Sequence, residues 1–264
     1  MKTIIFMNEK GGPGKTTLST YFAAGLAIRN PNHRVLMLDA DQQGNTTQML
    51  GLPLAGKFYD LCVRNAAWRD VIEPIHPEMY APKADGSYGK LYAVQGNSET
   101  VNIPNQLQDA KQLASKFAEI KNVFTHVIID TNPTPTMLHR ILATISDWLV
   151  IPTEPEIFSA HSGIPQTLER TEDLRDQGRA KLLAIIPNKF RGRTALHKGF
   201  LDDLRSKYGD KVITAIPLAV ALAESQVERQ FLYSMAPQFK ITSKMYRMVD
   251  ELCERMGEVS YEQN

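Results

Sequence analysis

The chain has 264 residues, enough for a sizeable core, and one α/β domain can use all of them, so we expect a single domain over residues 1–264. Apolar residues make up 43% and charged residues 22%, which is ordinary for a globular protein and excludes a disordered chain. The 30 Lys and Arg nearly balance the 29 Asp and Glu. The net charge of +1 therefore gives no overall attraction to nucleic acid or anionic lipid, and such binding would need a local patch.

The two cysteines, Cys62 and Cys253, lie far apart and form no CxxC pair or Cys/His cluster. They indicate neither a disulfide framework nor a zinc or iron–sulfur site, and a reducing cytoplasm fits best. Residues 1–7 are apolar but run into a polar glycine-rich turn, which favours a buried strand over a signal peptide. No later apolar run approaches the roughly 20 residues of a membrane-spanning helix, so we expect a soluble protein.

Short apolar runs alternate with longer segments of helical period, the pattern of βα units around a mainly parallel sheet. We interpret the runs as strands because they are too brief for buried helices. The predicted strands are residues 3–7, 34–38, 91–94, 126–129, 148–151, 182–186 and 212–216. Apolar spacing predicts helices over residues 107–120 and 241–256, and residues 81–89 are the best candidate for an extended loop. The expected fold class is α/β, with a mainly parallel twisted sheet and helices on both faces.

A glycine-rich turn follows the first predicted strand and leads into a segment of helical character. Strand, glycine-rich turn and helix is the arrangement in which backbone N–H groups and a helix N-terminus hold phosphate. Lys15 would contact the β- and γ-phosphates, Thr16 would supply a hydroxyl to Mg²⁺, and Thr17 would make a phosphate contact. The alternative is a turn that binds nothing. The nucleotide-binding candidates in this turn are Gly11, Gly12, Pro13, Gly14, Lys15, Thr16 and Thr17.

The run from Lys10 to Thr16 resembles the deviant Walker A motif of the ParA/MinD/NifH superfamily of P-loop ATPases, in which the first lysine is the signature residue. Glu9 stands where the strict P-loop has glycine, and Pro13 replaces the usual valine and removes one possible N–H donor. The resemblance implies a Mg²⁺-dependent ATPase that forms an ATP-sandwich dimer. Lys10 would then reach the phosphates bound by the partner subunit, much as an arginine finger does, and the alternative is a solvated lysine.

Two further segments place carboxylates at the carboxyl ends of predicted strands, where open α/β sheets bind ligands. Asp39 and Asp41 lie in a segment similar to the family's switch I; by resemblance, Asp39 supports hydrated Mg²⁺ and Asp41 orients or deprotonates the attacking water. Asp130 ends a run that resembles a Walker B strand and would hold Mg²⁺ through water. Gln42 and Asn132 depart from prolines common in these motifs. Taken alone, an Asp-rich turn is more often a helix cap or a solvated loop.

Two positions later in the chain are candidates for holding the base. Asn188 lies in a segment that resembles the MinD-like strand end whose asparagine binds the adenine edge. The alternative is an asparagine that only forms a turn. Pro217 stands where members of the family place a second wall of the base pocket. The resemblance thus spans most of the chain, but it is most specific at residues 10–16 and loose from Asn188 onward.

The ATPase core is shared by proteins with different cellular functions, so the branch of the superfamily must be inferred from residues outside this core. An iron–sulfur carrier needs bridging cysteines, which Cys62 and Cys253 do not supply. A MinD-like membrane-associated positioning ATPase, the alternative we keep, needs a basic amphipathic C-terminus, whereas residues 254–264 are acidic. We expect a ParA-type partition or cargo-positioning ATPase, cytoplasmic and nucleoid-associated. Its expected partners are a second copy in the ATP state, non-specific DNA and a ParB-like or cargo-adaptor protein that stimulates hydrolysis, with no membrane partner.

Basic residues late in the chain are the candidates for DNA binding. Each of them could equally be a solvated charge beside the acidic residues interleaved with them, so the prediction concerns the cluster. The chain starts at the first strand without the N-terminal helix-turn-helix extension of some plasmid ParA proteins, and we expect no operator-specific reading of DNA. The candidates are Lys189, Arg191, Arg193, Lys198, Arg229, Lys240, Lys244 and Arg247, with Arg205 and Lys207 in the same stretch.

Overall fold

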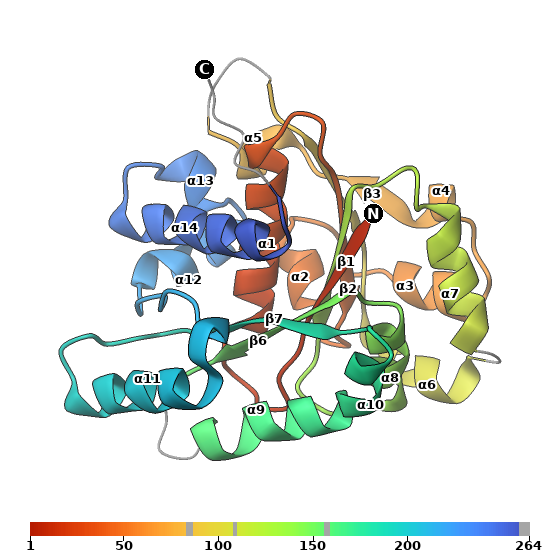
Figure 1. Cartoon of the computed structure of the whole chain (residues 1–264). Coiled ribbons are helices and arrows are strands. Elements are labelled where there is room, and N and C mark those ends of the chain that lie inside the picture. The colour runs from red at the N-terminus through yellow and green to blue at the C-terminus, as the bar shows by residue number, and fades with distance from the viewer. Residues whose placement is uncertain (83–86, 108–109, 156–158, 259–264) are drawn as a thin grey trace.

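The computed structural model describes residues 1–82, 87–107, 110–155 and 159–258. In these residues a seven-stranded sheet has the order β3-β4-β2-β5-β1-β6-β7, and helices lie on both sides of it (Figure 1). All neighbouring strands are parallel except β3, which pairs antiparallel with β4 at one edge. The strands are β1 (Lys2–Phe6), β2 (Arg34–Ala40), β3 (Ile72–Pro74), β4 (Lys90–Val94), β5 (His126–Thr131), β6 (Trp148–Thr153) and β7 (Lys181–Pro187).

The helices of the described residues range from single turns to the 16 residues of α14, which lies beside α1 (Figure 1). The α-helices are α1 (Lys15–Arg29), α2 (Asn45–Met49), α3 (Lys57–Cys62), α4 (Trp68–Val71), α5 (Pro77–Tyr80), α6 (Ile103–Gln106), α7 (Ala110–Glu119), α8 (Met137–Thr144), α9 (Ser159–Arg170), α10 (Glu172–Asp176), α11 (Ala195–Tyr208), α12 (Val220–Val227), α13 (Leu232–Met235) and α14 (Lys240–Arg255). Two 3₁₀ turns, η1 (Ser98–Asn102) and η2 (Gly209–Lys211), complete the set.

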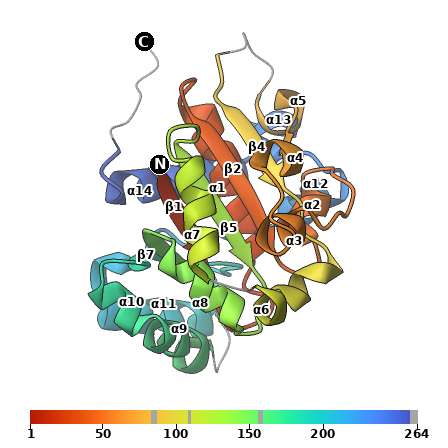
Figure 2. The same cartoon turned by 90° about the vertical axis from the view of Figure 1, so that its right-hand side faces the viewer.

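Both faces of the sheet are buried because successive strand residues point into two different apolar cores. In β1, Ile4 packs into the core that contains α1 and α14, and Ile5 packs into the core on the other face. The first core also includes α5, α12 and α13, whereas α3, α4, α7, α8 and α11 contribute to the second. Figure 2 shows α7 in front of the sheet and α14 at its far side, so the fold has three layers.

The predicted fold class is confirmed, and so are both predicted helices and the first six predicted strands, within a few residues at their ends. The strand predicted over residues 212–216 is wrong. Val212 forms an isolated bridge with Ile185, and the amides of Ile213 and Ile216 donate to the carbonyls of Ile185 and Pro187, so this segment advances three residues while β7 advances two. The ladder is therefore interrupted.

The short strand β3 has no counterpart in the prediction, since three residues ending in proline show no alternation to recognise. The predicted loop over residues 81–89 lies partly outside the described residues, at positions 83–86. Cys62 and Cys253 are both buried as free thiols, one in each core. Among the helices that the structure describes, none combines the length and apolar character needed to cross a membrane.

The sheet brings the expected site residues to one edge. β1 lies between β5 and β6, and β5 lies between β1 and β2, so the carboxyl ends of these strands meet. In this register Asp130 is opposite both Phe6 of β1 and Asp39 of β2. The turn that follows β1 therefore starts beside the two carboxylates, where ligands of parallel α/β sheets bind.

Candidate nucleotide site

The turn between β1 and α1 has a backbone that glycine is needed to form. Gly12 and Gly14 have φ of 90° and 86°, a region that other L-residues enter only with strain. A Cβ atom on Gly14 would overlap Nδ2 of Asn188. Lys15 is the first residue of α1, so the turn ends at a helix N-terminus, where partial positive charge and N–H groups favour a phosphate.

The side chain of Lys15 is buried beneath this turn. Its Nζ donates to the carbonyl oxygens of Asn8 and Lys10, at 3.2 and 3.3 Å. Burial lowers the pKa of Lys15, although the negative charges of Asp130 and Asp41 act in the opposite direction. Carbonyl dipoles do not neutralise a buried ammonium, so an anion placed in the turn would give this cation the counter-charge that it needs.

Asp130 offers an oxygen that the protein leaves unpaired. The carboxylate is fully buried, and its Oδ2 accepts hydrogen bonds from the hydroxyls of Thr16 and Thr46, at 2.7 and 2.8 Å. Its Oδ1 is buried without a hydrogen-bond partner. Burial raises the pKa of Asp130 to about 6 in spite of the two hydroxyls and Lys15, and Asp41 adds to the rise. An unpaired carboxylate oxygen beside a threonine hydroxyl is a donor set that suits Mg²⁺, so Thr16 and Asp130 fit this ion.

Asp39 and Asp41 hold the segment that follows β2. Asp39 Oδ2 accepts from the amide and the hydroxyl of Thr47, at 2.8 and 2.6 Å, and its Oδ1 accepts from the Asp41 amide at 3.2 Å. Burial and the nearby Asp130 raise the pKa of Asp39 to about 7. Both oxygens of Asp39 thus bind protein donors, so this residue fixes the start of α2. Asp41 is 5% exposed and accepts from the Gln43 amide at 2.9 Å, which holds it beside the turn.

Of the two residues predicted to hold the base, Asn188 lies against the phosphate turn. Asn188 is buried and donates from Nδ2 to the Pro13 carbonyl at 2.9 Å. Pro217 forms an isolated bridge with Phe190, two residues after Asn188. Pro13 has no N–H to offer a phosphate, but its carbonyl oxygen accepts this hydrogen bond from Asn188. The structure brings Asn188 to the turn and pairs Pro217 with Phe190, two residues further along; their contact with adenine stays a prediction.

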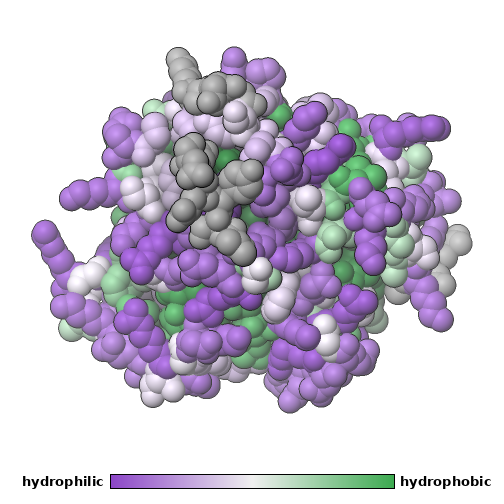
Figure 3. All heavy atoms as spheres, turned by 45° about the horizontal axis from the view of Figure 1, so that its top comes forward, coloured by the Kyte–Doolittle hydropathy of each residue, from purple (hydrophilic) through white to green (hydrophobic). Residues whose placement is uncertain are grey.

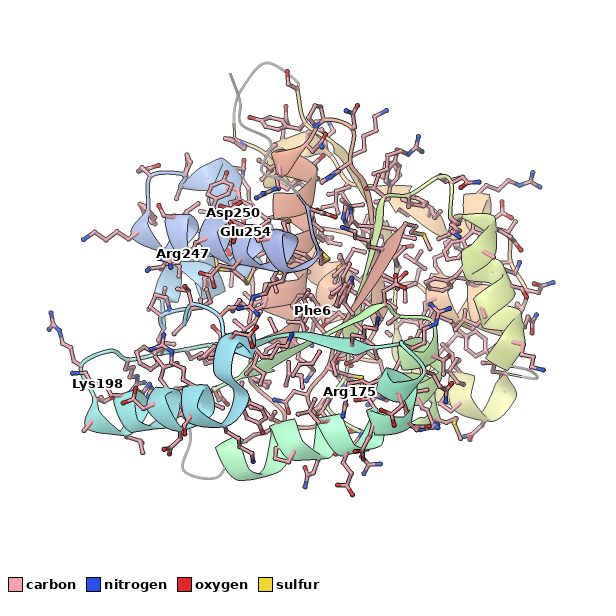
Figure 4. All side chains as sticks on the ribbon, in the orientation of Figure 1. Phe6, Arg175, Lys198, Arg247, Asp250 and Glu254 are labelled. Carbon is pink, nitrogen blue, oxygen red and sulfur yellow. The ribbon has the colours of Figure 1, made fainter. Side chains whose placement is uncertain are left out.

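The basic candidates are spread over several elements on one side of the molecule. Lys189 lies at the phosphate turn, where its Nζ donates to the Gly12 carbonyl at 2.6 Å and pairs with Glu154 at 2.9 Å. Arg247 pairs with Glu251 at 2.8 Å, on a stretch of α14 that also carries Asp250 and Glu254 (Figure 4). Lys198 projects from α11 (Figure 4). Arg191 and Arg193 precede α11, Arg229 follows α12, and Lys240 and Lys244 are on α14.

Four residues at the site were not predicted from the sequence. Thr46 donates to Asp130, and Asn8 binds the Lys10 amide through Oδ1 and the Pro152 carbonyl through Nδ2, which fastens the turn to β6. Glu154 pairs with Lys189, and Gln226 of α12 donates to the Thr17 hydroxyl at 2.6 Å. A cavity of about 470 Å³ is lined by Thr16, Thr17, Gln226 and residues of α2. Thr46 and Asn8 adjoin the motifs in sequence, but nothing in the sequence marks Gln226, 209 residues beyond its partner.

The parallel sheet, the glycine turn leading into α1 and the buried carboxylate at the end of β5 define a P-loop nucleotide-binding protein. Residues 1–184 match the family model AAA_31, described as an AAA domain, and the chain belongs to this family. Together with the relatives below, the match identifies a partition ATPase of the ParA/MinD superfamily.

The names of similar proteins indicate the same class. The chromosome-partitioning ATPase Soj of Thermus thermophilus is 27% identical over 98% of each chain. The chromosome partitioning protein ParA of Caulobacter vibrioides is 28% identical over 85% of this chain and 84% of its own. Among solved structures, a Cyanothece McdA–ATP complex has a TM-score of 0.79 and 19% identity, covering 100% of this chain and 99% of its own. The septum site-determining protein MinD of Pyrococcus horikoshii with Mg-ADP has a TM-score of 0.76 and 19% identity, covering 97% of both chains.

Proposed function

We propose that this protein hydrolyses ATP with Mg²⁺ and positions DNA or another cargo by switching between a free form and an ATP-sandwich dimer that binds DNA non-specifically. The observation that carries the proposal is the group formed by Lys15, Thr16 and Asp130. It combines a buried cation under the glycine turn with an unpaired carboxylate oxygen beside a hydroxyl. These groups are complementary to the phosphates and the metal of Mg-ATP.

In the proposed mechanism the residues from Gly11 to Thr17 hold the phosphates. Lys15 turns from the two carbonyls that it now contacts toward the β- and γ-phosphates. Thr16 and Asp130 would hold Mg²⁺, with Asp39 supporting from β2. When bound, Mg²⁺ neutralises charge that develops on the phosphate oxygens.

Asp41 is proposed to aim the attacking water and accept its proton. The hydrogen bond from the Gln43 amide fixes the orientation of the Asp41 carboxylate, which is almost completely buried. In-line attack requires a proton acceptor that is held in place. Asn188 and Pro217 are proposed as contacts for the base, from the side of the turn on which Asn188 already binds Pro13.

Lys10 is proposed to complete the site of a second copy of the chain. Its amide is held by Asn8 Oδ1, so the backbone at the signature position is fixed before any partner arrives. A lysine that reaches the partner subunit's phosphates would couple ATP binding to dimerisation, because neither site is complete alone. We also propose that residues 1–264 form one ATPase domain, since α1 and α14, from the two ends of the chain, share a core.

DNA binding is proposed for the basic residues around α11, α12 and α14, which lie on the same side of Figure 1. Lys189 and Arg247 have carboxylate partners within the chain, so the remaining candidates are expected to contribute more. Each phosphate neutralised on duplex DNA should add about 0.9 to the slope of log affinity against log salt. In the cell this dimer would associate with the nucleoid, and a ParB-like or cargo-adaptor protein would stimulate hydrolysis.

Co-sedimentation with DNA and with anionic liposomes, each in ATP and in ADP, tests the proposal. We expect the protein to sediment with DNA in ATP and to stay in solution in ADP. Sedimentation with liposomes in ATP, without DNA binding, would instead support a membrane-associated positioning ATPase. Equal binding to DNA in both nucleotides would contradict the proposed switch.

A further inference from the structure

A second group of ligand-type side chains lies at the opposite edge of the sheet, where the strands begin. His33 precedes β2, His126 is the first residue of β5, and Glu258 follows α14. Each offers one imidazole nitrogen or carboxylate oxygen, and these atoms lie within 4.8 Å of one another. Figure 3, which brings the top of Figure 1 forward, shows a largely hydrophilic surface over the described residues. The three residues come from separate parts of the chain, so no local sequence motif contains them.

One imidazole presents a nitrogen lone pair to this group, and the other does so once its facing nitrogen gives up a proton. His33 Nδ1 lies 2.7 Å from the Leu26 carbonyl, and a carbonyl only accepts, so Nδ1 carries the proton and Nε2 is left as an acceptor. His126 Nδ1 lies 2.9 Å from the Thr125 hydroxyl, which also contacts the Arg34 carbonyl at 3.1 Å. His126 Nε2 lies 2.7 Å from the Glu258 carboxylate, which only accepts, so Nε2 carries a proton that must leave before a metal binds there. Nδ1 can then donate to the Thr125 hydroxyl, which donates to the Arg34 carbonyl. A backbone or hydroxyl partner on one ring nitrogen is how proteins orient histidines whose other nitrogen binds a metal.

Glu258 faces His126 with a carboxylate that the protein satisfies only in part. Its Oε1 lies 2.7 Å from His126 Nε2 and accepts from Lys2 Nζ at 2.7 Å, while its Oε2 is buried without a hydrogen-bond partner. Leaving a buried carboxylate oxygen unpaired costs free energy. The other nearby cation, Arg29, is paired with Asp250 of α14. Lys2 is therefore the group that competes with any further cation for Glu258.

We propose that His33, His126 and Glu258 bind a divalent transition metal of the zinc class, with water as the fourth ligand. Two histidines and one glutamate with an open position are a known tetrahedral zinc ligand set, and imidazole suits zinc, copper and nickel. The cluster borders a cavity of about 430 Å³, which has room for the water.

Binding requires a small contraction and the release of Lys2. Tetrahedral ligands at about 2.1 Å from zinc lie about 3.4 Å from one another, so separations of up to 4.8 Å in the group must shrink by up to about 1.4 Å. The side chain of Lys2 is 34% exposed and can turn to solvent when it leaves Glu258. The bound ion would join β2, β5 and the segment after α14, at the edge of the sheet away from the nucleotide turn. Its effect would therefore be on stability and on the C-terminal segment.

The test is zinc affinity of the full chain after treatment with a chelator, measured by calorimetry, with the visible absorption of Co²⁺ as a report on tetrahedral ligation. Wild type should bind one equivalent. Loss of an outer partner of a ligand costs about 10–100-fold in affinity, so His33→Ala and Glu258→Gln should each weaken binding by at least about 100-fold. Lys2→Ala should tighten it, because the competing ammonium is gone. His76→Ala, on a side chain that is 70% exposed, is the matched control and should leave affinity unchanged.

The Lys2→Ala variant separates a metal site from an ion cluster that only pins the C-terminal segment. A gain in zinc affinity cannot arise from damage to the fold. If wild type binds no more tightly than His33→Ala, or if Lys2→Ala does not bind more tightly than wild type, the proposal is overturned. A loss in His76→Ala equal to that in His33→Ala would show binding by surface histidines and would overturn it equally.

Discussion

Replacing Gly14 by alanine should destabilise the protein by about 2–5 kcal/mol. The φ of 86° at this position costs a residue with a Cβ about 1–2 kcal/mol. The new Cβ would also displace the Asn188 side chain, because it would overlap Nδ2. Asn188 is buried, so losing its hydrogen bond to the Pro13 carbonyl adds about 1–3 kcal/mol.

Urea unfolding without nucleotide measures this cost, and Gly178→Ala is the matched control. Gly178 has a similar φ of 78°, but the nearest atom to its Cβ would be the flexible end of Lys181 at 3.7 Å. The control should therefore lose only about 1–2 kcal/mol. Adding Asn188→Ala to Gly14→Ala should recover part of the loss, since the two side chains no longer compete. Equal losses in Gly14→Ala and Gly178→Ala would refute the close approach of Asn188 to the turn.

Three further outcomes follow from the contacts of the site and of α14. Lys15→Ala should lose ATP binding in a filter or calorimetric assay, and intact affinity would rule out the P-loop assignment. Asp41→Ala should bind ATP and remain on DNA without turnover, so a variant that hydrolyses ATP at the wild-type rate would exclude its catalytic role. Burial alone would raise the pKa of Glu251, but hydrogen bonds from Thr214 and the pairing with Arg247 hold it below the usual 4.5. A lowered carboxyl pKa stabilises the fold above 4.5 and loses this effect as pH falls below it, so Glu251→Gln should flatten the acid limb of a stability–pH curve.

Much of the fold and of the site could be predicted because local sequence determines them. The buried strands are short apolar runs, and the turn before Lys15 needs glycines whose φ is positive, so each leaves a mark in the sequence. Asp130 could be predicted as a candidate metal ligand because it ends such a strand. Residues that act across the fold leave no mark: the contact of Gln226 with Thr17 depends on where α12 packs. The extra residue between Ile213 and Ile216 likewise interrupts a predicted strand, and the apolar pattern does not show it.

The molecular mass of the protein in solution with ATP, for wild type and two lysine variants, tests the central claim most directly. Sedimentation velocity with bound nucleotide recorded in the same run reports both properties. Wild type should double its mass with ATP, Lys15→Ala should stay a monomer without nucleotide, and Lys10→Ala should stay a monomer with ATP bound. If Lys10→Ala forms the ATP dimer as readily as wild type, Lys10 does not act across the interface, and the proposed link between ATP binding and dimerisation is wrong.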